Sequence, residues 1–395
     1  MRRIVLVGGG HAHVHLLKVA ASHPPKDTEL VLVSPTGWHH YSGMVPGYLA
    51  GTYTESDMAF DLRALATAAG ALLVEGVATS VSAARREVEF HARGGMEGER
   101  LPFDRASLDV GSAPVGLELP GVREHAATVR PMSRAVELRE RLDALIARAP
   151  GASGAIRVCV VGAGAAGVEV ALALNRRIRA AGRVAQVTLV DAGGRILPGF
   201  SDRVRRRALG VLHRDGITVL RRTRASRVMA DALVLETGQS LPTDLTVWLG
   251  GAAPPPLLAA SDLPLDPNGF FLVDAELRAV APARARRPPV WGAGDCIALE
   301  GAPWMPRAGV YAVRQSPVLA ENVLAARAAD DPAADPAGDA AADPARYSPQ
   351  RSFLSLMNTA DGRALLRWKG LVSHSRWAWW LKDRIDRRFM DRYQR

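Results

Sequence analysis

The sequence predicts an α/β protein with two Rossmann-like dinucleotide-binding units and a C-terminal α+β appendage. Two glycine-rich turns, each between an apolar strand pattern and a helix pattern, predict the two units. The third observation is the segment 328–346, which is rich in alanine, aspartate, proline and glycine and separates the appendage as a disordered or extended linker. A chain of 395 residues also exceeds what one hydrophobic core usually supports, so several domains are expected.

The stronger turn lies in the middle of the chain, where the strand pattern 158–161 runs into the motif G-x-G-x-x-G. In this motif Gly162 makes the tight turn, Gly164 lets a pyrophosphate approach the backbone, and Gly167 lets the helix sit close to the strand. The helix N-terminus then offers free N–H groups and a positive dipole end to the phosphates. A second strand pattern ending at Asp191 completes the expected context.

A poorer copy of the same turn stands at the start of the chain. The strand pattern 4–7 leads into residues 8–13, GGGHAH, and then into a helix over about 14–21. His13 occupies the third glycine position, where a bulky side chain stands between helix and sheet. The following strand pattern, 29–33, ends at Ser34 where an acid is expected, yet a dinucleotide turn is still favoured over an ordinary βα loop.

The remaining elements follow from periodicity and turn residues. Residues 38–48 mix aromatics, histidines, glycine and proline, so we expect a structured loop that either faces a cofactor or is an ordinary surface loop. The patterns further predict helices over 61–69, 131–149, 202–215 and 309–326, strands over 71–76, 217–220 and 227–236, and hairpin-like pairs over 79–92 and 101–110. The arginine-rich helix 202–215 is most simply a solvated face.

Composition excludes several classes of protein. Hydrophobic residues make up 48% and charged residues 23%, with no run of 18 apolar residues, so no spanning helix is expected. The apolar run at the N-terminus is too short for a signal peptide, which favours a cytoplasmic protein. Two cysteines, Cys159 and Cys296, cannot form a disulfide framework or a zinc site, so we expect no metal. The net charge of +10 is accompanied by no nucleic-acid motif, so no nucleic-acid partner is expected.

Two dinucleotide units in one chain predict two nucleotides and electron transfer between them. A flavin and a nicotinamide fit this arrangement, because hydride passes from nicotinamide to flavin when the rings stack. The motifs GGGHAH (8–13), DVGS (109–112), VVGAGAAGVE (160–169), VWLGG (247–251) and GAGDC (292–296) occur in this order. In that order the chain resembles the pyridine nucleotide-disulfide oxidoreductase superfamily, and within it the type II NADH dehydrogenase-like flavoproteins.

A narrower resemblance rests on residues 41–53, 312–323, 352–359 and 376–390. These stretches resemble the flavoprotein that in some bacteria is fused ahead of selenide, water dikinase, although no kinase half is present here. The resemblance covers nearly the whole chain and implies an NAD domain inserted in an FAD domain. The implied divisions are 1–120 and 246–327 for the FAD-binding domain, 121–245 for the NAD(P)H-binding domain, 328–346 for the linker, and 347–395 for an interface or membrane-surface segment.

The resemblance also implies the cofactor contacts. FAD would be bound by Gly8, Gly9, Gly10, His11, Ala12, Ser34, Gly111, Gly294, Asp295 and Arg314, with Gln315 facing the flavin ring. NADH would be bound by Gly162, Gly164, Ala165, Ala166, Gly167 and Asp191. A carboxylate at position 191 would accept hydrogen bonds from the ribose hydroxyls and repel a 2′-phosphate, which favours NADH over NADPH. Arg195 lies close enough in sequence to soften that preference.

Three further residues are candidates for catalysis. Glu169 lies in the first turn of a helix, where an acid is stabilised by the helix dipole, so a capping role is the alternative. The resemblance implies instead that Glu169 reaches the nicotinamide near the flavin. His40 and Tyr41, with the neighbouring His39, are candidate proton donors or acceptor-site residues.

The C-terminal segment bears on the electron acceptor. Its apolar residues are spaced by four, and arginines and a lysine lie between them, as expected for an amphipathic helix: Trp377, Leu381, Ile385, Phe389 and Tyr393. Such a helix over 376–395 either packs on the protein or a partner subunit, or lies at the inner face of a membrane, where a quinone acceptor would be found. A homodimer stays open.

These observations predict an FAD-dependent NAD(P)H oxidoreductase that passes electrons from the flavin to an unidentified small acceptor, a quinone or another compound, without a cysteine relay. Two alternatives remain from the sequence alone. One is a selenium- or sulfur-related flavoprotein reductase, and the other is a flavin-binding sensor or scaffold with low turnover.

Overall fold

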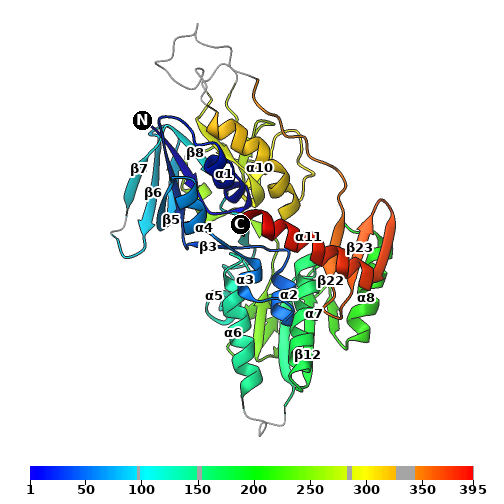
Figure 1. Ribbon diagram of the computed structural model, residues 1–395. Coiled ribbons are helices and arrows are strands. Elements are labelled where there is room, and N and C mark those ends of the chain that lie inside the picture. Colours follow the sequence, from blue (N-terminus) through cyan, green and yellow to red (C-terminus); the bar gives the residue numbers. More distant parts are fainter. Residues whose placement is uncertain (96–97, 149–153, 283–286, 326–342, 395) are drawn as a thin grey trace.

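A computed structural model describes residues 1–95, 98–148, 154–282, 287–325 and 343–394. Two units built on parallel sheets lie one above the other, and a small C-terminal unit reaches from the second back to the first (Figure 1). This arrangement confirms the predicted fold class. The predicted linker lies outside the described residues over 328–342.

The first unit is built on a seven-stranded sheet. Its strands, in spatial order, are β20 (Val290–Gly292), β8 (Arg105–Leu108), β1 (Arg2–Val7), β2 (Thr28–Ser34), β5 (Leu72–Ser82), β6 (Glu87–Ala92) and β7 (Glu99–Pro102). The first five run parallel, and β6 and β7 extend the sheet as an antiparallel hairpin pair. The run of β-branched and aliphatic residues in β1 is buried on both faces, which parallel sheets covered by helices require. Helices α1 (His11–Ser22) and α10 (Gly309–Leu324) pack side by side against this sheet (Figure 1).

The second unit is inserted between strands of the first. Its parallel sheet has the order β10 (Ala126–Ala127), β17 (Leu245–Trp248), β11 (Ile156–Val161), β12 (Ala185–Asp191) and β13 (Thr218–Arg221). The unit also contains helices α6 (Arg134–Ala147), α7 (Ala165–Ala180) and α8 (Asp202–Arg214), and the antiparallel strands β14 (Ala225–Val228), β15 (Ala232–Leu235) and β16 (Ser240–Pro242). Strand β8 precedes the second unit in the chain, and β20, which pairs with β8 in the first sheet, follows it. The second unit is therefore an insertion in the chain of the first.

Shorter elements lie between these strands and helices along the chain. They are β3 (Trp38–His40), α2 (Val45–Ala50), α3 (Glu55–Met58), β4 (Ala59–Asp61), α4 (Leu62–Ala68), β9 (Ala113–Pro114), α5 (Val122–His125), β18 (Ala252–Ala253), α9 (Pro256–Ala259), β19 (Phe271–Val273), the 3₁₀ turn η1 (Gly294–Cys296) and β21 (Ile297–Leu299). Helix α2 packs on α7, and Arg139 of α6 donates to the carbonyl of Tyr48 at 3.1 Å, so the two units are held together beside the start of α7.

The C-terminal unit is a three-stranded meander followed by one long helix. Strands β22 (Ser355–Asn358), β23 (Ala364–Trp368) and β24 (Leu371–Ser375) pair in antiparallel order and lie beside α8. Helix α11 (Arg376–Gln394) then crosses from this meander to α1, α3 and β4 of the first unit (Figure 1). The C-terminal unit therefore bridges the two dinucleotide domains.

Two predictions about local structure are wrong. The segment 38–48 is not a loop, because β3 pairs with β4 and helix α2 begins at Val45. Pairing with a strand some 20 residues along the chain, at Ala59–Asp61, overrides the irregular local pattern. The predicted strand 227–236 is a hairpin, β14 and β15, joined through Met229–Asp231.

The orientation of α11 also differs from the apolar stripe. Its buried residues are Ala378, Lys382, Asp386, Met390 and Tyr393. Trp377 and Ile385 of the predicted stripe are 57% and 41% exposed. From Ala378 to Met390 the helix buries a face displaced by one residue from the stripe, whereas Phe389 and Tyr393 of the stripe do pack on the first unit.

Candidate active site

The first turn has the backbone that a dinucleotide requires. Gly8 has φ of +90°, and a Cβ there would stand 2.5 Å from the carbonyl oxygen of Asp109. Gly10 is the N-cap of α1, in extended backbone and without a side-chain cap. The N-terminal end of α1 thus lies at the carboxyl ends of β1 and β8, where ligands bind in open α/β sheets.

His13 is accommodated at the third glycine position by two hydrogen bonds. Its Nδ1 lies 2.5 Å from the carbonyl oxygen of Gly8, and its Nε2 lies 2.8 Å from Oγ of Ser107 on β8. Nδ1 therefore donates to the carbonyl and Nε2 accepts from the hydroxyl. Burial lowers the pKa of His13 to about 4, so the imidazole is neutral. The side chain bridges helix and sheet where a glycine would allow direct contact.

Asp109 is a buried carboxylate beneath this turn. Its Oδ2 accepts from the backbone N–H groups of Ala12 at 2.7 Å and His13 at 3.3 Å. A Cβ at Gly10 would stand 2.3 Å from the Asp109 carboxylate. Burial raises the pKa of Asp109 to about 7, against the two N–H donors, which lower it, and the nearby Asp295 adds to the rise. A bound FAD pyrophosphate would share the N-terminal end of α1 with this carboxylate.

We expect FAD retention to weaken as pH rises through about 7, because Asp109 then becomes an anion beside the pyrophosphate. The change Asp109→Asn preserves an acceptor for the Ala12 N–H and removes the charge. The variant should retain FAD equally at pH 6 and pH 8, whereas the parent should release more at pH 8. Free flavin fluorescence in an ultrafiltrate measures the released fraction.

Asp244→Asn is the matched control for this prediction. The hydrogen bond from Arg157 holds the pKa of Asp244 below its usual range, so this carboxyl stays ionised between pH 6 and 8. Asp244→Asn should therefore release FAD as the parent does. If FAD release by Asp109→Asn depended on pH as it does in the parent, Asp109 would not be the group that weakens FAD binding.

Buried polar atoms around the predicted flavin site have no hydrogen-bond partner among the described residues. They are His11 Nε2, Arg130 Nη1, Arg307 Nε and Gln315 Nε2. Buried donors of this kind are costly unless a ligand or water pairs them, so these residues fit a polar cofactor such as FAD. Arg130 and Arg307 also stabilise the carboxylate of Asp295, although burial raises the pKa of that group overall.

Four other residues that the resemblance assigns to FAD belong to the first unit, and their contacts differ. Gln315 accepts from the N–H of Gly294 at 2.8 Å, which brings α10 to the GAGDC turn. Ser34 is buried beside Gly9 and donates to the carbonyl of Thr36 at 2.8 Å. Gly111 has φ of +69°. Arg314 is exposed on α10, and its role stays a prediction.

The second turn matches the motif in full. Gly162 has φ of +105°, and a Cβ at Gly167 would stand 1.7 Å from the carbonyl oxygen of Gly162. A Cβ at Gly164 would meet nothing within 4 Å, so the approach to the turn is open. The Asp191 carboxylate accepts from the N–H groups of Ala163 and Gly193, each at 2.7 Å. Asp191 thus stands beside the turn, as the ribose contact requires.

The change Gly167→Ala should raise the NADH concentration that half-reduces the flavin at least about tenfold, a loss of about 1.4 kcal/mol of binding. The added methyl group would push α7 away from Gly162 and misplace the N–H donors. Anaerobic titration followed at the flavin absorbance band measures the effect. Gly210→Ala in α8, where a Cβ would meet nothing within 4 Å, is the control and should titrate like the parent.

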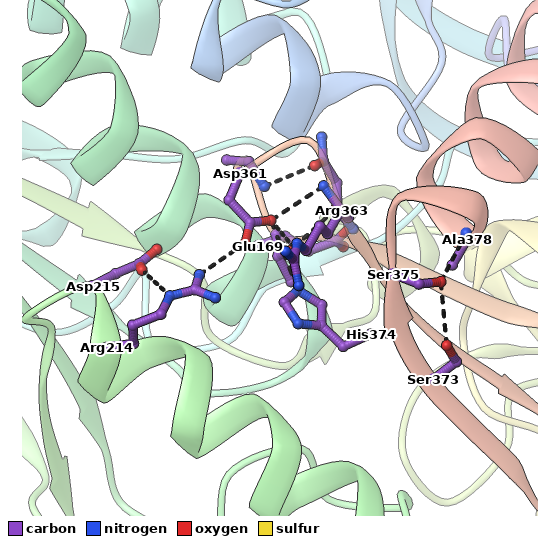
Figure 2. A network of polar contacts seen from close by, with 12 residues as sticks. Glu169, Arg214, Asp215, Asp361, Arg363, Ser373, His374, Ser375 and Ala378 are labelled. Carbon is purple, nitrogen blue, oxygen red and sulfur yellow. Dashed lines mark hydrogen bonds and ion pairs between the residues drawn. The ribbon is translucent and has the colours of Figure 1, made fainter.

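Glu169 lies where the two dinucleotide units and the C-terminal unit meet. Glu169 (Figure 2) does not lie in the first turn of α7 as expected, because the helix begins at Ala165 and its first turn holds no acid. Its Oε1 accepts instead from the backbone N–H of Asn358 in β22 at 2.6 Å. Burial raises the pKa of Glu169 to about 7; Lys382 and the Asn358 N–H lower it, and Asp386 raises it. An acid with this pKa gains or releases a proton near neutral pH.

A buried ion pair on α11 faces this region. Lys382 Nζ lies 2.5 Å from Asp386 Oδ2 and donates to the carbonyl of Gly43 at 2.7 Å. Tyr41 donates its hydroxyl proton to Asp386 Oδ1 at 3.2 Å. Burial, and then the charge of Asp386, raises the pKa of Tyr41 above its usual range. The structure thus brings Tyr41 together with α11 and places Lys382 and Asp386 between it and Glu169.

The histidines divide into two groups. His39 contacts His11, with 3.2 Å between Nε2 and Nδ1, and stacks on Phe60. Burial, and then the neighbouring histidines His11 and His40, hold the pKa of His39 well below its usual range. His40 is buried, and its Nε2 lies 3.2 Å from Glu55 Oε1. His40 and Glu169 are therefore not brought together by any described contact.

Neither cysteine can act in a thiol relay. Both are free and buried, Cys159 in the second unit and Cys296 in the first. Cys296 Sγ lies 3.2 Å from the carbonyl of Ala293, and burial raises its pKa to about 12. The thiolate form that a relay needs is strongly disfavoured.

Residues 2–323 match the family model described as pyridine nucleotide-disulphide oxidoreductase. The chain belongs to this family. It is thus an oxidoreductase, with FAD and NADH as its cofactors. FAD held at the first turn would supply a two-electron carrier able to accept hydride from a nicotinamide held at the second. The narrower resemblance to the flavoprotein fused ahead of selenide, water dikinase stays a prediction.

Several proteins are similar to the chain. A probable NADH dehydrogenase of Dictyostelium discoideum is 24% identical over 78% of this chain and 70% of its own length. An NADH dehydrogenase-like protein of Mycobacterium tuberculosis is 29% identical over 75% of this chain and 73% of its own length. An internal alternative NAD(P)H-ubiquinone oxidoreductase of Solanum tuberosum is 28% identical over 56% of this chain, which spans only 46% of that protein.

Among solved structures, NDH2 from Plasmodium falciparum in complex with NADH shares the fold. Its TM-score is 0.79 at 14% identity, and the alignment covers 100% of this chain and 99% of that one. The sulfide:quinone oxidoreductase of Aquifex aeolicus has a TM-score of 0.75 at 16% identity over 100% of this chain and 92% of its own.

Sequence reasoning missed four residues of this site: Asp109, Asn358, Lys382 and Asp386. Asp109 was visible as an acid at the end of a buried strand, a signal for a polar contact at a ligand edge. Lys382 and Asp386 stand four residues apart on a helix, but that spacing is equally typical of a solvated pair. Asn358 acts through its backbone N–H and leaves no signal in the sequence.

Proposed function

We propose that the chain is an NADH:quinone oxidoreductase of the type II kind. NADH reduces FAD, NAD⁺ leaves, and a quinone takes the electrons from the flavin without a cysteine relay. The observation that carries the proposal is Glu169, whose carboxyl has a pKa of about 7 and stands where both nucleotide domains meet the C-terminal unit. Reduction of a quinone to a quinol consumes protons, and a partly buried acid with this pKa can hold one for the acceptor.

The names of similar proteins support a quinone as acceptor. The potato relative is an NAD(P)H-ubiquinone oxidoreductase, a Synechocystis relative is a demethylphylloquinone reductase, and a Haemophilus influenzae relative is a type II NADH:quinone oxidoreductase. The buried cysteines support direct transfer from flavin to acceptor.

A membrane surface is the natural source of a quinone, and the C-terminal unit offers a face for it. Large apolar side chains there are exposed, at the tip of the β23–β24 hairpin and along the start of α11: Trp368, Leu371, Trp377 and Trp380. Lys369 and Arg384 lie close to the Trp368 and Trp380 rings, so cations flank these aromatics, as anionic interfaces favour. None of the helices described here is long and apolar enough to cross a bilayer. We propose a peripheral contact through this face, and the inner face of the membrane as its location.

Anaerobic half-reactions test the proposed function. NADH should bleach the bound flavin, NADPH should do so less well, and a short-chain ubiquinone analogue should then restore the yellow colour. Flavin that NADH cannot bleach would refute the donor half, and reduced flavin that reoxidises with oxygen but not with the quinone would refute the acceptor half. Sedimentation with anionic vesicles, before and after Trp377→Ser and Trp380→Ser, tests the membrane contact.

A further inference from the structure

A basic cavity lies between α8 of the nicotinamide unit and the β23–β24 hairpin of the C-terminal unit. Its volume is about 570 Å³. Most of the residues that line it are cationic or titratable: Arg203, Arg206, Arg207, Arg214, Arg363 and His374. Gly210 and Val211 of α8 complete the lining. Figure 2 shows Arg214, Arg363 and His374 approaching one another from the two sides of this region. The lining does not include Asp191 or the glycines of the second turn, Gly162, Gly164 and Gly167.

The arginines of α8 gather on one side of the helix. Arg203, Arg207 and Arg214 follow the spacing of four and seven that keeps side chains on one face, and the buried face carries Val204, Ala208 and Val211. Like charges three or four residues apart destabilise a helix. Without an occupant, this face opposes the stability of α8.

Two carboxylates of the described residues pair with an arginine of the cavity, and both pair with Arg214: Asp215 at 2.8 Å and Asp361 at 2.8 Å. Asp361, in the turn between β22 and β23, accepts from Arg214 at 2.8 Å, and its Oδ1 lies 3.7 Å from His374 Nε2 (Figure 2). Burial alone would raise the pKa of Asp361, but His374, Thr359 and Arg214 together outweigh burial and hold it below its usual range. Thr359 donates its hydroxyl proton to Asp361 Oδ1 at 2.6 Å, so the carboxylate is shared by Arg214, Thr359 and His374.

The other arginines of the cavity are left without a counter-ion. Within the described part of the chain, no ion pair is formed by Arg203, Arg206, Arg207 or Arg363. Arg205, by contrast, does not line the cavity and forms an ion pair with Asp202. On α8, an arginine outside the cavity is therefore paired. Four unpaired guanidinium groups from two units of the protein therefore converge on one cavity.

We propose that this cavity is a binding site for a phosphate-bearing anion with more than one negative charge, such as a diphosphate group. Guanidinium groups bind phosphate oxygens through paired N–H donors, and several of them around one hollow select a multiply charged group over chloride. The volume is larger than a single phosphate needs, so the phosphates belong to a larger molecule or to a lipid headgroup. The site is separate from both nucleotide turns and does not depend on the proposed redox function.

Titration with inorganic pyrophosphate tests the site. The FAD-loaded protein is saturated with NAD⁺, so that both glycine turns are filled, and binding is measured by calorimetry at constant ionic strength. The double change Arg206→Glu and Arg207→Glu should weaken pyrophosphate binding at least about tenfold, because it places two anions in the cavity. The double change Arg176→Glu and Arg179→Glu, at exposed positions of α7, alters the net charge equally and should bind as the parent does.

A second arm separates the two sources of phosphate. Vesicles of phosphatidylcholine with and without phosphatidic acid, whose phosphomonoester can carry more than one negative charge, replace pyrophosphate, and co-sedimentation replaces calorimetry. Loss of vesicle binding alone in the α8 variant would assign the cavity to a lipid headgroup, and loss of pyrophosphate binding would assign it to a free phosphate compound. Equal binding of both probes by the α8 variant, the α7 variant and the parent would overturn the proposal.

Discussion

Replacing Glu169 with glutamine is expected to lower turnover with a quinone by about 100-fold, the lower range for loss of an acid–base group. The amide oxygen of glutamine can still accept from the N–H of Asn358, so the contact between α7 and β22 is kept. What the variant loses is the proton that the carboxyl holds near neutral pH. Stopped-flow reoxidation of the reduced protein by a quinone measures the affected step, and reduction by NADH should change much less.

The pH profile distinguishes a proton carrier from a packing residue. Burial raises the pKa of Glu169 from 4.5 to about 7, so the carboxyl is protonated below that pH and ionised above it. If the protonated form serves the acceptor, reoxidation in the parent slows as pH rises through about 7. Glu169→Gln should show a flat profile over the same range. A glutamine variant with the parent's profile would contradict the role of Glu169.

A measurement of stability shows whether lost turnover in Glu169→Gln comes from unfolding. The direction of the expected stability change follows from the same pKa. A carboxyl whose pKa is raised in the folded state keeps a proton that the unfolded chain releases. Its contribution is therefore present below about pH 4.5 and is lost as pH rises through about 7. At pH 8 the parent carries a partly buried ionised carboxylate that the glutamine variant lacks. Glu169→Gln should therefore melt at the same or a higher temperature than the parent at pH 8, while its turnover falls.

The two nucleotide turns could be predicted because their signal is local. Strand, glycine turn and helix lie within about 30 residues, and each glycine answers a backbone demand seen in the structure. The sequence shows that His13 replaces the third glycine, but it does not show how the bulky side chain is accommodated. Its partner Ser107 lies 94 residues away, and only the sheet register places it opposite the imidazole.

The packing of α11 marks the limit of periodicity as a guide. The pattern predicts a helix, and a helix is found. The apolar stripe nevertheless misidentifies the buried face, because Lys382 and Asp386 are read as solvated by default. They are buried because Gly43 and Tyr41, more than 300 residues earlier, supply a carbonyl and a hydroxyl to complete their hydrogen bonds. Partners so distant in sequence leave no periodic signal.

Breaking the buried pair on α11 should have the largest effect on stability. The change Lys382→Met is expected to lower the free energy of unfolding of the C-terminal unit by about 3 kcal/mol, because it leaves Asp386 charged and buried without its cation. Both side chains are about 95% buried, so water cannot replace the lost partner. Urea unfolding followed by tryptophan fluorescence reports on this unit, since Trp377, Trp379 and Trp380 lie on α11.

A double change separates the ion pair from simple loss of packing. Asp386→Asn keeps an acceptor for the hydroxyl of Tyr41 and removes the stranded charge, so Lys382→Met with Asp386→Asn should recover about 2 kcal/mol of the loss. The pair Asp383–Arg387 on the same helix, with side chains 29% and 50% exposed, is the matched control, and Arg387→Met should cost less than about 1 kcal/mol. If Lys382→Met cost no more than Arg387→Met, water would reach Asp386, and α11 would be held to the first unit by its aromatic contacts instead.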